Sequence, residues 1–455
     1  MMLGTTSTQS QHSVDQDRVR RAIMIVTACM VAFAIVFPRS ATTIFLVPAV
    51  AALGVWFALA QWRGTGLPLN GLMLAILAFA GWSLISATWS VAPFASLTKP
   101  LFLIAGAAGL TALFEIAKKS EPEILAAVAH GFVLGFLGGA ALVCFEILTD
   151  QAITQWFMRT FAMLREGYDK HLVVKDGVIV GVGEGNINRR ATVVTLLIVP
   201  AGLLLARVAD ARLRRTGIAL LLAICAIMLV ASTHQSSQAA ILAGGIAFGL
   251  ARLSPTWTRR AIGVAWCASC LLVVPLVLFL HDANLHKNAA VFNSARHRVV
   301  IWNTTAEAVK KAPLLGIGAD ATAKQTEIAT KAREASGTVI KDGAYEVTTA
   351  RHAHNAFLQV WYELGAVGAV VFMLAGLAAL GLCMNAPALA QPFLLAQFAA
   401  IAGMIAFSFS IWQLWLQGAI GLGLIGILIA IGDSLSASAS KGWPLFEGSD
   451  RQQRI

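Results

Sequence analysis

The feature that most constrains this chain is a series of long apolar stretches, each close to the ~20 residues that a helix needs to cross a bilayer core. Apolar residues make up 58% of the 455 residues and charged residues only 13%, a balance typical of membrane proteins. Lipid offers the backbone no hydrogen-bond partners, so each stretch must be helical. The sequence therefore predicts an all-α polytopic membrane protein.

The apolar stretches predict about twelve transmembrane helices. They cover 21–37, 41–60, 67–89, 95–117, 122–148, 187–206, 215–233, 237–252, 260–280, 356–382, 388–412 and 415–432. The domain organisation that follows is a disordered tail at 1–20, spans one to nine within 21–280, a helical loop at 281–355, spans ten to twelve within 356–432, and a tail at 433–455. A shorter polar loop at 149–186 interrupts the first group of spans.

The basic residues predict how these spans are oriented. Short connectors after even-numbered spans hold most of them, and connectors after odd-numbered spans hold almost none, with Arg39 as the exception. By the positive-inside rule, both termini are cytoplasmic and the two long loops are periplasmic. The net charge of +11 is then a topology signal, and we expect no nucleic-acid partner.

The loop at 281–355 has helical periodicity of its own. Residues 294–312 predict an amphipathic helix with Trp302 on its apolar side, and Pro313 with the glycines of LLGIG ends it. Residues 321–335 predict a second, more polar helix. Neither is apolar enough to span, so we expect both to lie over the mouth of the bundle.

The segment RHAHNAFLQVWYELGAVG, at 351–368, carries the sharpest chemical signal. His354 stands where the long loop enters the tenth span, and Gly365 and Gly368 follow eleven and fourteen residues later, close to whole helical turns. Such a strip of small residues lets another helix, or a lipid tail, approach the backbone closely beneath His354. The helix N-terminus and Arg351 disfavour the imidazolium form, leaving a neutral imidazole that can act as a general base. The alternative is a surface histidine at a helix cap.

Four arginines predict an anion site near the same membrane surface. Arg189 and Arg190 begin the sixth span, and Arg296 and Arg298 begin the loop helix. The planar guanidinium matches phosphate oxygens bidentately, although contact with lipid headgroups or loop acids is the alternative. Neither long loop carries an acidic pair at metal-ligand spacing, so we expect a mechanism without metal or cofactor.

Together these residues resemble a known family. His354-Asn355, nine further residues and then Gly365-x-x-Gly368 resemble the signature of the O-antigen ligase family, which is related to O-antigen polymerases and to some protein O-oligosaccharyltransferases. The stretches SARHRVVIW, PLLGIG and NRRATVV are similar to other motifs of that family. One departure is Ser237-Gln238, where family members often carry Ser-Arg.

The resemblance implies a fold and an activity. The fold would be the large multispan bundle of lipid-linked glycosyltransferases (the GT-C-like class), in a Gram-negative inner membrane with the active site at the periplasmic face. O-antigen would pass from undecaprenyl diphosphate to a sugar hydroxyl of lipid A–core oligosaccharide with inversion, and membrane lipids would surround the enzyme. His354 would be the base, and Arg298, helped by Arg189, Arg190 and Arg296, would hold the diphosphate.

Other functions remain open on the sequence. An O-antigen or exopolysaccharide polymerase would share the donor chemistry and differ in its acceptor. A protein O-oligosaccharyltransferase often carries an extra periplasmic domain after its last span, whereas the tail expected here is short and cytoplasmic. A transporter or flippase for a lipid-linked solute is the alternative from another class, and against it few ionisable residues lie deep in the spans.

Overall fold

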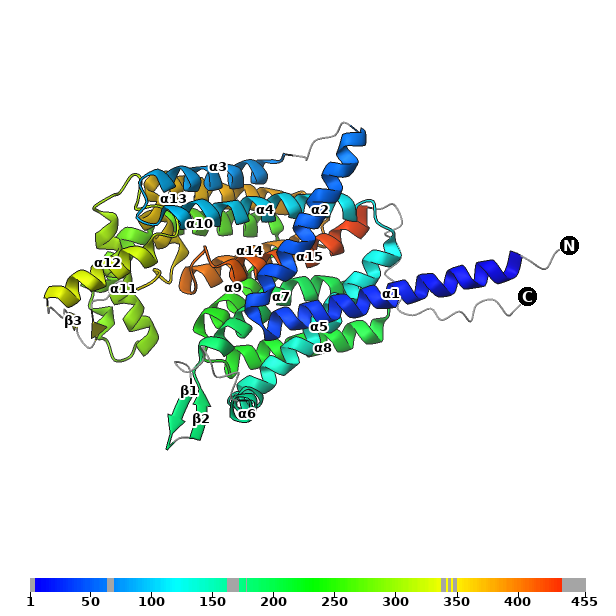
Figure 1. Ribbon diagram of the computed structural model, residues 1–455, viewed down its shortest axis with the longest axis horizontal. Helices are drawn as coiled ribbons and strands as arrows, with labels where there is room; N and C mark the ends of the chain where they lie inside the picture. The colour runs from blue at the N-terminus through cyan, green and yellow to red at the C-terminus, as the bar shows by residue number, and fades with distance from the viewer. Residues whose placement is uncertain are drawn as a thin grey trace. The chain divides into compact units, whose positions relative to one another are not determined.

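The computed structural model describes residues 5–63, 69–161, 172–176, 178–336, 341–342, 345–346 and 350–435. Twelve long helices coincide with the twelve expected spans. They are α1 (Thr5–Val36), α2 (Ala41–Arg63), α3 (Gly71–Ile85), α4 (Pro93–Ala117), α5 (Pro122–Leu148), α7 (Gly185–Ala206), α8 (Ala211–Val230), α9 (Gln235–Leu253), α10 (Pro255–Asp282), α13 (Ala356–Met384), α14 (Gln391–Phe407) and α15 (Leu414–Leu435) (Figure 1).

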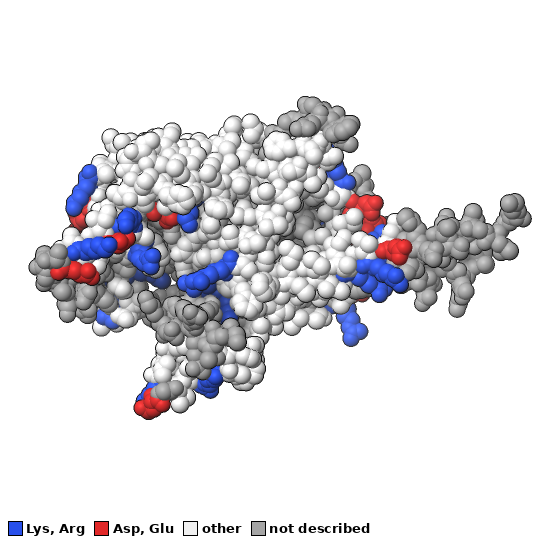
Figure 2. All heavy atoms as spheres, viewed as in Figure 1, with Lys and Arg blue, Asp and Glu red and all other residues white. Residues whose placement is uncertain are grey.

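Ten helices in the described part of the chain are long and apolar enough to cross a membrane. The two expected spans outside that set are α9, which is rich in small and polar residues, and α14, which has only 17 residues. On the face shown in Figure 2 the long helices present largely uncharged surface. The prediction of an all-α polytopic membrane protein is confirmed.

One boundary prediction is wrong. The helix α1 begins at Thr5, so most of the tail expected to be disordered at 1–20 is helical. The apolar candidate span within it covers Asp15–Val36. The residues before Asp15 lack an apolar face, but a helix that is already nucleated extends at little further cost. The C-terminal tail expected at 433–455 lies outside the described residues from 436 onwards.

The chain divides into two compact units. The first unit comprises residues 1–47, 112–242 and 418–455, and the second comprises 48–111 and 243–417. In the first unit, α1 and α5 run alongside one another (Figure 1). Glycines allow this approach, because a Cβ at Gly131 would lie 2.4 Å from the carbonyl oxygen of Met24. In the second unit, α13 packs against α3 and α10.

The two long loops contain short elements. The loop at 149–186 holds α6 (Ala152–Thr160) and an antiparallel hairpin of β1 (Leu172–Lys175) and β2 (Val178–Val182). The loop at 281–355 holds a 3-10 turn, η5 (Leu285–Lys287), then α11 (Asn293–Val309) and α12 (Thr322–Ser336), close to the predicted bounds of its two helices, followed by β3 (Lys341–Asp342) and β4 (Tyr345–Glu346). Two more 3-10 turns, η1 (Pro38–Ser40) and η2 (Ser86–Thr88), precede α2 and follow α3.

Candidate active site

The start of α13 places the histidine of the family signature. Asn355 is the N-cap of α13, and its buried side chain accepts a hydrogen bond from the Leu358 amide at 3.0 Å. His354 precedes this cap with φ +52, a left-handed conformation that a histidine rarely adopts. The imidazole therefore stands outside the helix rather than in its first turn, held there by a backbone that costs free energy to maintain.

His354 is surrounded by other titratable groups of the second unit. Its ring lies 4.0 Å from that of His352. Burial, followed by the charges of His352, Arg298 and His297, lowers the pKa of His354 to about 3, and a hydrogen bond with the Ser408 backbone acts in the opposite direction. The lowered pKa favours the neutral imidazole, but its first cause is burial, which differs from the predicted causes. Arg351 lowers the pKa of His352, second to burial, and is not among the causes for His354.

The helix α11 brings cationic side chains to this histidine. Arg298 is half-buried, its pKa is lowered by burial, and it forms no hydrogen bond or ion pair with any described residue. Arg296 has a buried Nε that lacks a partner among the described residues. Trp302 packs its ring 6.3 Å from that of Phe407, which directly precedes Ser408. The structure thus assembles His354 and Arg298 and leaves arginine donors unsatisfied, as a site for an anion requires.

The helix below His354 is interrupted. Gly365 has φ +66 and ψ −165 inside α13, so the backbone ladder breaks there. The segment PLLGIG (313–318) fills the break: the amides of Ile317 and Gly318 donate to the carbonyls of Tyr362 and Glu363 at 3.1 and 2.8 Å. These are backbone groups that an interrupted helix would otherwise leave without partners.

The predicted lipid track along Gly365 and Gly368 is wrong. A Cβ at Gly365 would lie 2.2 Å from the Leu314 carbonyl oxygen, and one at Gly368 would lie 2.2 Å from Cβ of Leu364. Both glycines are covered by the chain itself. The prediction assumed an unbroken helix of 3.6 residues per turn, and the break at Gly365 removes that alignment.

Glu363 is a functional candidate that sequence reasoning missed. Its side chain is 1% exposed and accepts hydrogen bonds from five groups of the second unit. The donors are the Asp320 amide (3.1 Å), the Thr322 amide (3.3 Å) and hydroxyl (2.5 Å), Gln359 Nε2 (3.1 Å) and Trp412 Nε1 (2.5 Å). An ionisable residue inside an apolar span is itself a signal of function, and Glu363 offered that signal nine residues after His354.

Lys99 and Asp320 lie beside this carboxylate. Lys99 of α4 forms an ion pair with Asp320 at 3.8 Å. Burial raises the pKa of Asp320 to about 6, and Lys99 opposes the rise. PLLGIG is therefore hydrogen-bonded to the backbone of α13, and the residues after it are bonded to the Glu363 carboxylate through the Asp320 and Thr322 amides and the Thr322 hydroxyl.

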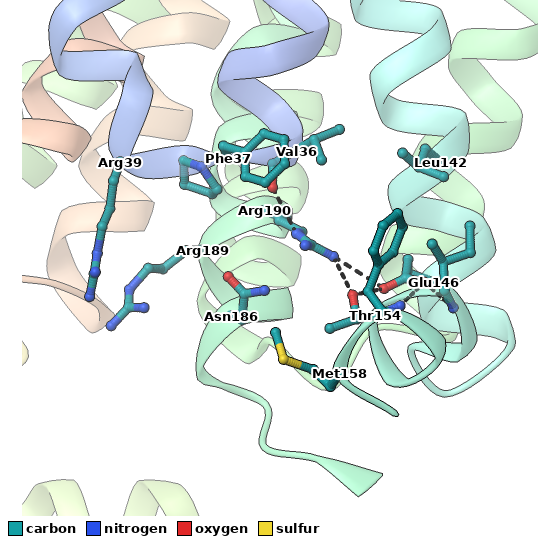
Figure 3. Close-up of a pocket in the computed structure, with 13 residues that line it drawn as sticks. Val36, Phe37, Arg39, Leu142, Glu146, Thr154, Met158, Asn186, Arg189 and Arg190 are labelled. Carbon is teal, nitrogen blue, oxygen red and sulfur yellow. Dashed lines mark hydrogen bonds and ion pairs between the residues drawn. The ribbon is translucent and has the colours of Figure 1, made fainter. Parts of the chain in front are cut away.

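The first unit holds the other two predicted arginines. Arg190 donates from Nη1 to Glu146 Oε2 at 3.1 Å and to Thr154 Oγ1 at 3.0 Å, and from Nε to the Val36 carbonyl at 2.9 Å (Figure 3). It therefore connects the end of α1 to α5 and α6. Arg189 lines a pocket of about 420 Å³ beside it. Arg190 thus forms a buried ion pair with Glu146, whereas the side chain of Arg189 points away from Glu146 (Figure 3).

Ser237 and Gln238, where the sequence departs from the family pattern, both have hydrogen-bond partners. Gln238 Nε2 donates to the carbonyls of Leu229 and Ser232 at 3.0 and 2.8 Å, so this amide caps the end of α8. The neighbouring Ser237 Oγ lies 2.7 Å from Nδ1 of the buried His234. No group of three His, Cys, Asp or Glu side chains within the described ranges could hold a metal ion.

The fold and this site define a multi-pass helical membrane protein with a neutral histidine beside unsatisfied arginines, outside its apolar spans. Residues 218–373, which include α11 and the start of α13, match the family model described as O-Antigen ligase, the family that the motifs of this segment resemble.

Two curated proteins are also similar to this chain. A protein of Rickettsia felis named "Putative polysaccharide ligase" is 29% identical over 178 residues, covering 38% of this chain and 41% of that protein. A similarly named protein of Rickettsia prowazekii is 32% identical over 131 residues, covering 29% of this chain and 31% of that protein. The chain thus spans less than half the length of either relative.

Proposed function

We propose that this protein transfers a polysaccharide from a lipid diphosphate to a sugar hydroxyl, and that it is an O-antigen ligase of a Gram-negative inner membrane. The donor is O-antigen on undecaprenyl diphosphate and the acceptor is lipid A–core oligosaccharide. The observation that carries the proposal is the juxtaposition of a neutral His354 with Arg298, whose guanidinium has no other partner among the described residues. The family match and the names of the Rickettsia proteins support the same class of reaction.

The site chemistry follows from these two side chains. His354 Nδ1 or Nε2 takes the proton of the acceptor hydroxyl, whose oxygen attacks the anomeric carbon and forms the new glycosidic bond. The bond from that carbon to the diphosphate oxygen breaks on the opposite face, so configuration inverts and undecaprenyl diphosphate leaves with the electron pair. Arg298, with Arg296, stabilises the charge that develops on this leaving group, an interaction strongest in the transition state.

The low pKa of His354 suits this order of events. Without substrate the imidazole is neutral and ready to accept a proton. A bound diphosphate brings negative charge close to it and raises its pKa, so the imidazole becomes a better base once the donor is present. The orientation proposed with this mechanism puts both termini in the cytoplasm and the site at the periplasmic face.

A reconstituted transfer assay tests the proposal. The purified protein in liposomes would be given undecaprenyl-diphosphate-linked O-antigen and lipid A–core acceptor. We expect His354→Ala to lower kcat by about 10²–10⁴, and Arg298→Gln to lower it by about 10²–10³. The matched control is Lys331→Gln, which removes an exposed charge of the same loop, where Lys331 Nζ donates to Glu327. Near-normal turnover in the His354 variant would refute the assignment of the base.

Two further experiments, one with a metal chelator and one with a deletion strain, distinguish the ligase from the alternative functions. Activity should persist in EDTA, and a loss restored by a divalent ion would contradict the metal-free chemistry. In a deletion strain, a ligase defect leaves O-antigen on its lipid carrier and lipopolysaccharide ending at the core. A polymerase defect would instead leave a single repeat attached, and a flippase defect would leave the donor on the cytoplasmic face.

A further inference from the structure

His352 is a histidine of the motif at 351–368 to which the proposed chemistry gives no part. It lies two residues before His354, and the two rings are 4.0 Å apart. Nδ1 of His352 lies 3.4 Å from the backbone nitrogen of His354 and accepts a hydrogen bond from that amide. The bond closes a turn in which a side chain bonds the backbone two residues further on, as Asn and Asp side chains commonly do.

This turn coincides with the left-handed backbone of His354. The φ of +52 is a conformation that a residue with a Cβ rarely adopts and that costs free energy to keep. A local side-chain hydrogen bond to the same residue offsets part of that cost. Without the bond, the backbone of His354 could relax towards an ordinary negative φ, and its imidazole would then point in another direction.

The residues on either side of the turn are held by other bonds. Thr326 of α12 donates its hydroxyl to the Ala350 carbonyl at 2.9 Å, and Asn355 caps the start of α13. Because both ends of the stretch 351–354 are held, a change within it acts on the backbone angles of His354 rather than on the neighbouring helices. The His354 ring also forms a hydrogen bond with the Ser408 backbone, which the ring reaches from this backbone conformation.

The bond requires one protonation state of His352. A backbone amide can only donate, so Nδ1 carries no proton and the proton of the neutral ring stands on Nε2. Burial, followed by the charge of Arg351, lowers the pKa of His352 to about 4. At neutral pH the Nδ1 atom is therefore available as an acceptor, and the bond is lost as the pH falls through 4.

We propose that His352 is a positioning residue, whose Nδ1 holds the backbone of His354 in the left-handed conformation that directs the imidazole towards the acceptor hydroxyl. His352 itself neither touches the reacting atoms nor takes their proton. The inference rests on the proposed function, in which His354 is the base, and it adds how that base is held in place.

Two matched variants distinguish the ring nitrogens of His352. The amide oxygen of His352→Asn can take the place of Nδ1 and close the same turn, whereas that of His352→Gln lies one methylene further, near the place of Nε2. In the reconstituted transfer assay, we expect His352→Ala and His352→Gln to lower kcat by about 10- to 100-fold with little change in KM. His352→Asn should restore most of the lost kcat.

Three results in this assay would overturn the inference: His352→Ala turns over as the wild type does, His352→Gln is as active as His352→Asn, or KM alone changes. Should His352→Ala fold poorly, the comparison of the Asn and Gln variants still decides. Because His352 acts through His354, the double variant His352→Ala/His354→Ala should be no slower than His354→Ala alone. A further loss in the double variant would mean that His352 acts on the substrate itself, contrary to the inference.

Chemical modification tests the turn without any substrate. Diethyl pyrocarbonate modifies accessible neutral imidazoles, and fragment mass spectra of the labelled peptide separate His354 from His352. We expect His354 to react at the wild-type rate in His352→Asn and faster in His352→Ala. Equal rates in all three proteins would contradict the turn, whatever the transfer assay shows. If His354→Ala keeps normal turnover while His352→Ala still speeds the modification, the proposed base fails and the placement of His354 by His352 stands.

Discussion

Two buried carboxylates show two ways of keeping a charge inside this membrane protein. Glu146 of α5 is 2% exposed and meets a full positive charge, because Arg190 Nη1 lies 3.1 Å from its Oε2. Glu363 of α13 is 1% exposed and meets only neutral donors, from backbone amides, a hydroxyl, a side-chain amide and an indole. Burial of a carboxylate costs free energy in both cases, and the two sites offset that cost differently.

The two carboxylates differ in how many separate elements their hydrogen bonds connect. Glu146 accepts from Thr154 and the Ile153 amide as well as from Arg190, so it fastens one helix end to its neighbours. Glu363 draws its donors from Asp320 and Thr322, which follow the PLLGIG segment, from Gln359 of its own helix and from Trp412. Because these are the elements that position the start of α13, Glu363 supports the site of His354 without touching it.

Replacement of Glu363 should produce the largest effect. Glu363→Ala would leave four donors without an acceptor, since Gln359 Nε2 also donates to Ser410, and at about 1–3 kcal/mol each we expect about 4 kcal/mol or more of destabilisation. That loss is comparable to the whole stability of many domains, and the variant should yield little folded protein. Glu363→Gln keeps one acceptor oxygen and should lose less. Yield and thermal unfolding in detergent, followed by tryptophan fluorescence, measure both.

The matched change in the first unit is Glu146→Gln, which keeps the shape and removes the charge. It should fold, because an amide oxygen can still accept from Thr154. A Glu363→Ala protein as stable as the wild type would mean that the hydrogen bonds around Glu363 contribute nothing net, contrary to the organising role assigned to it.

Removal of the cation from the other carboxylate should produce the second largest effect. Arg190→Met leaves Glu146 buried without a counterion, for which about 3–5 kcal/mol of destabilisation is typical. The double variant Arg190→Met/Glu146→Gln removes the stranded charge and should recover part of the loss. Thermal unfolding of the two single variants and the double variant forms a double-mutant cycle. Equal stability of the Arg190 variant and the double variant would contradict the pairing.

The two carboxylates also show what sequence could and could not predict. The apolar runs placed twelve helices correctly, because the requirement for internal backbone bonding in lipid leaves few alternatives. The motif residues His354 and Arg298 were predicted from local chemistry and resemblance, and they do lie together. Glu363 was missed although it lies inside the quoted motif, because its importance depends on donors that come from 40 or more residues away.

Arg190 is the opposite case, because the sequence singled it out for the diphosphate and the structure pairs it with Glu146. Its side chain suited a diphosphate as well as that of Arg189 did, and nothing in NRRATVV distinguishes them. Glu146 lies 44 residues earlier in the chain, so the ion pair was invisible to local reasoning. The break at Gly365 was missed for a similar reason: a glycine is tolerated in a membrane helix, and only the inserted PLLGIG segment makes its left-handed conformation necessary.

Replacement of a glycine should produce an intermediate effect and test the break itself. Gly365→Ala puts a Cβ 2.2 Å from the Leu314 carbonyl oxygen at a residue with φ +66, and we expect about 1–3 kcal/mol of destabilisation. Gly381→Ala is the control in the same helix, because nothing lies within 4 Å of its added Cβ. That control should be neutral or stabilising by about 0.5–1 kcal/mol. Thermal unfolding compares the two, and equal behaviour would argue against a break at Gly365.

The pH dependence of transfer should show the smallest effect, and its sign follows from burial. His354 has a pKa of about 3 in the folded protein against an ordinary value of 6.5. Its contribution to stability is therefore fully present above about pH 6.5 and is lost as the pH falls towards 3. In kcat/KM, which reports the free enzyme, His354 should produce no acidic limb between pH 5 and 8. The profile of kcat reports the enzyme with substrate bound. Because bound diphosphate raises the pKa of His354, the acidic limb of that profile should lie at higher pH.

Asp320 is the group most able to obscure this profile. Burial raises its pKa to about 6, so it ionises within the measured range, and Asp320→Asn removes that titration. The pKa of Asp320 is higher in the folded protein than its ordinary value of 3.8. Protonation of Asp320 therefore stabilises the folded state below about pH 4, and this contribution is lost as the pH rises through 6. The decisive profile is therefore that of Asp320→Asn. A limb near pH 6.5 in its kcat/KM would show an exposed histidine and contradict the buried, neutral base.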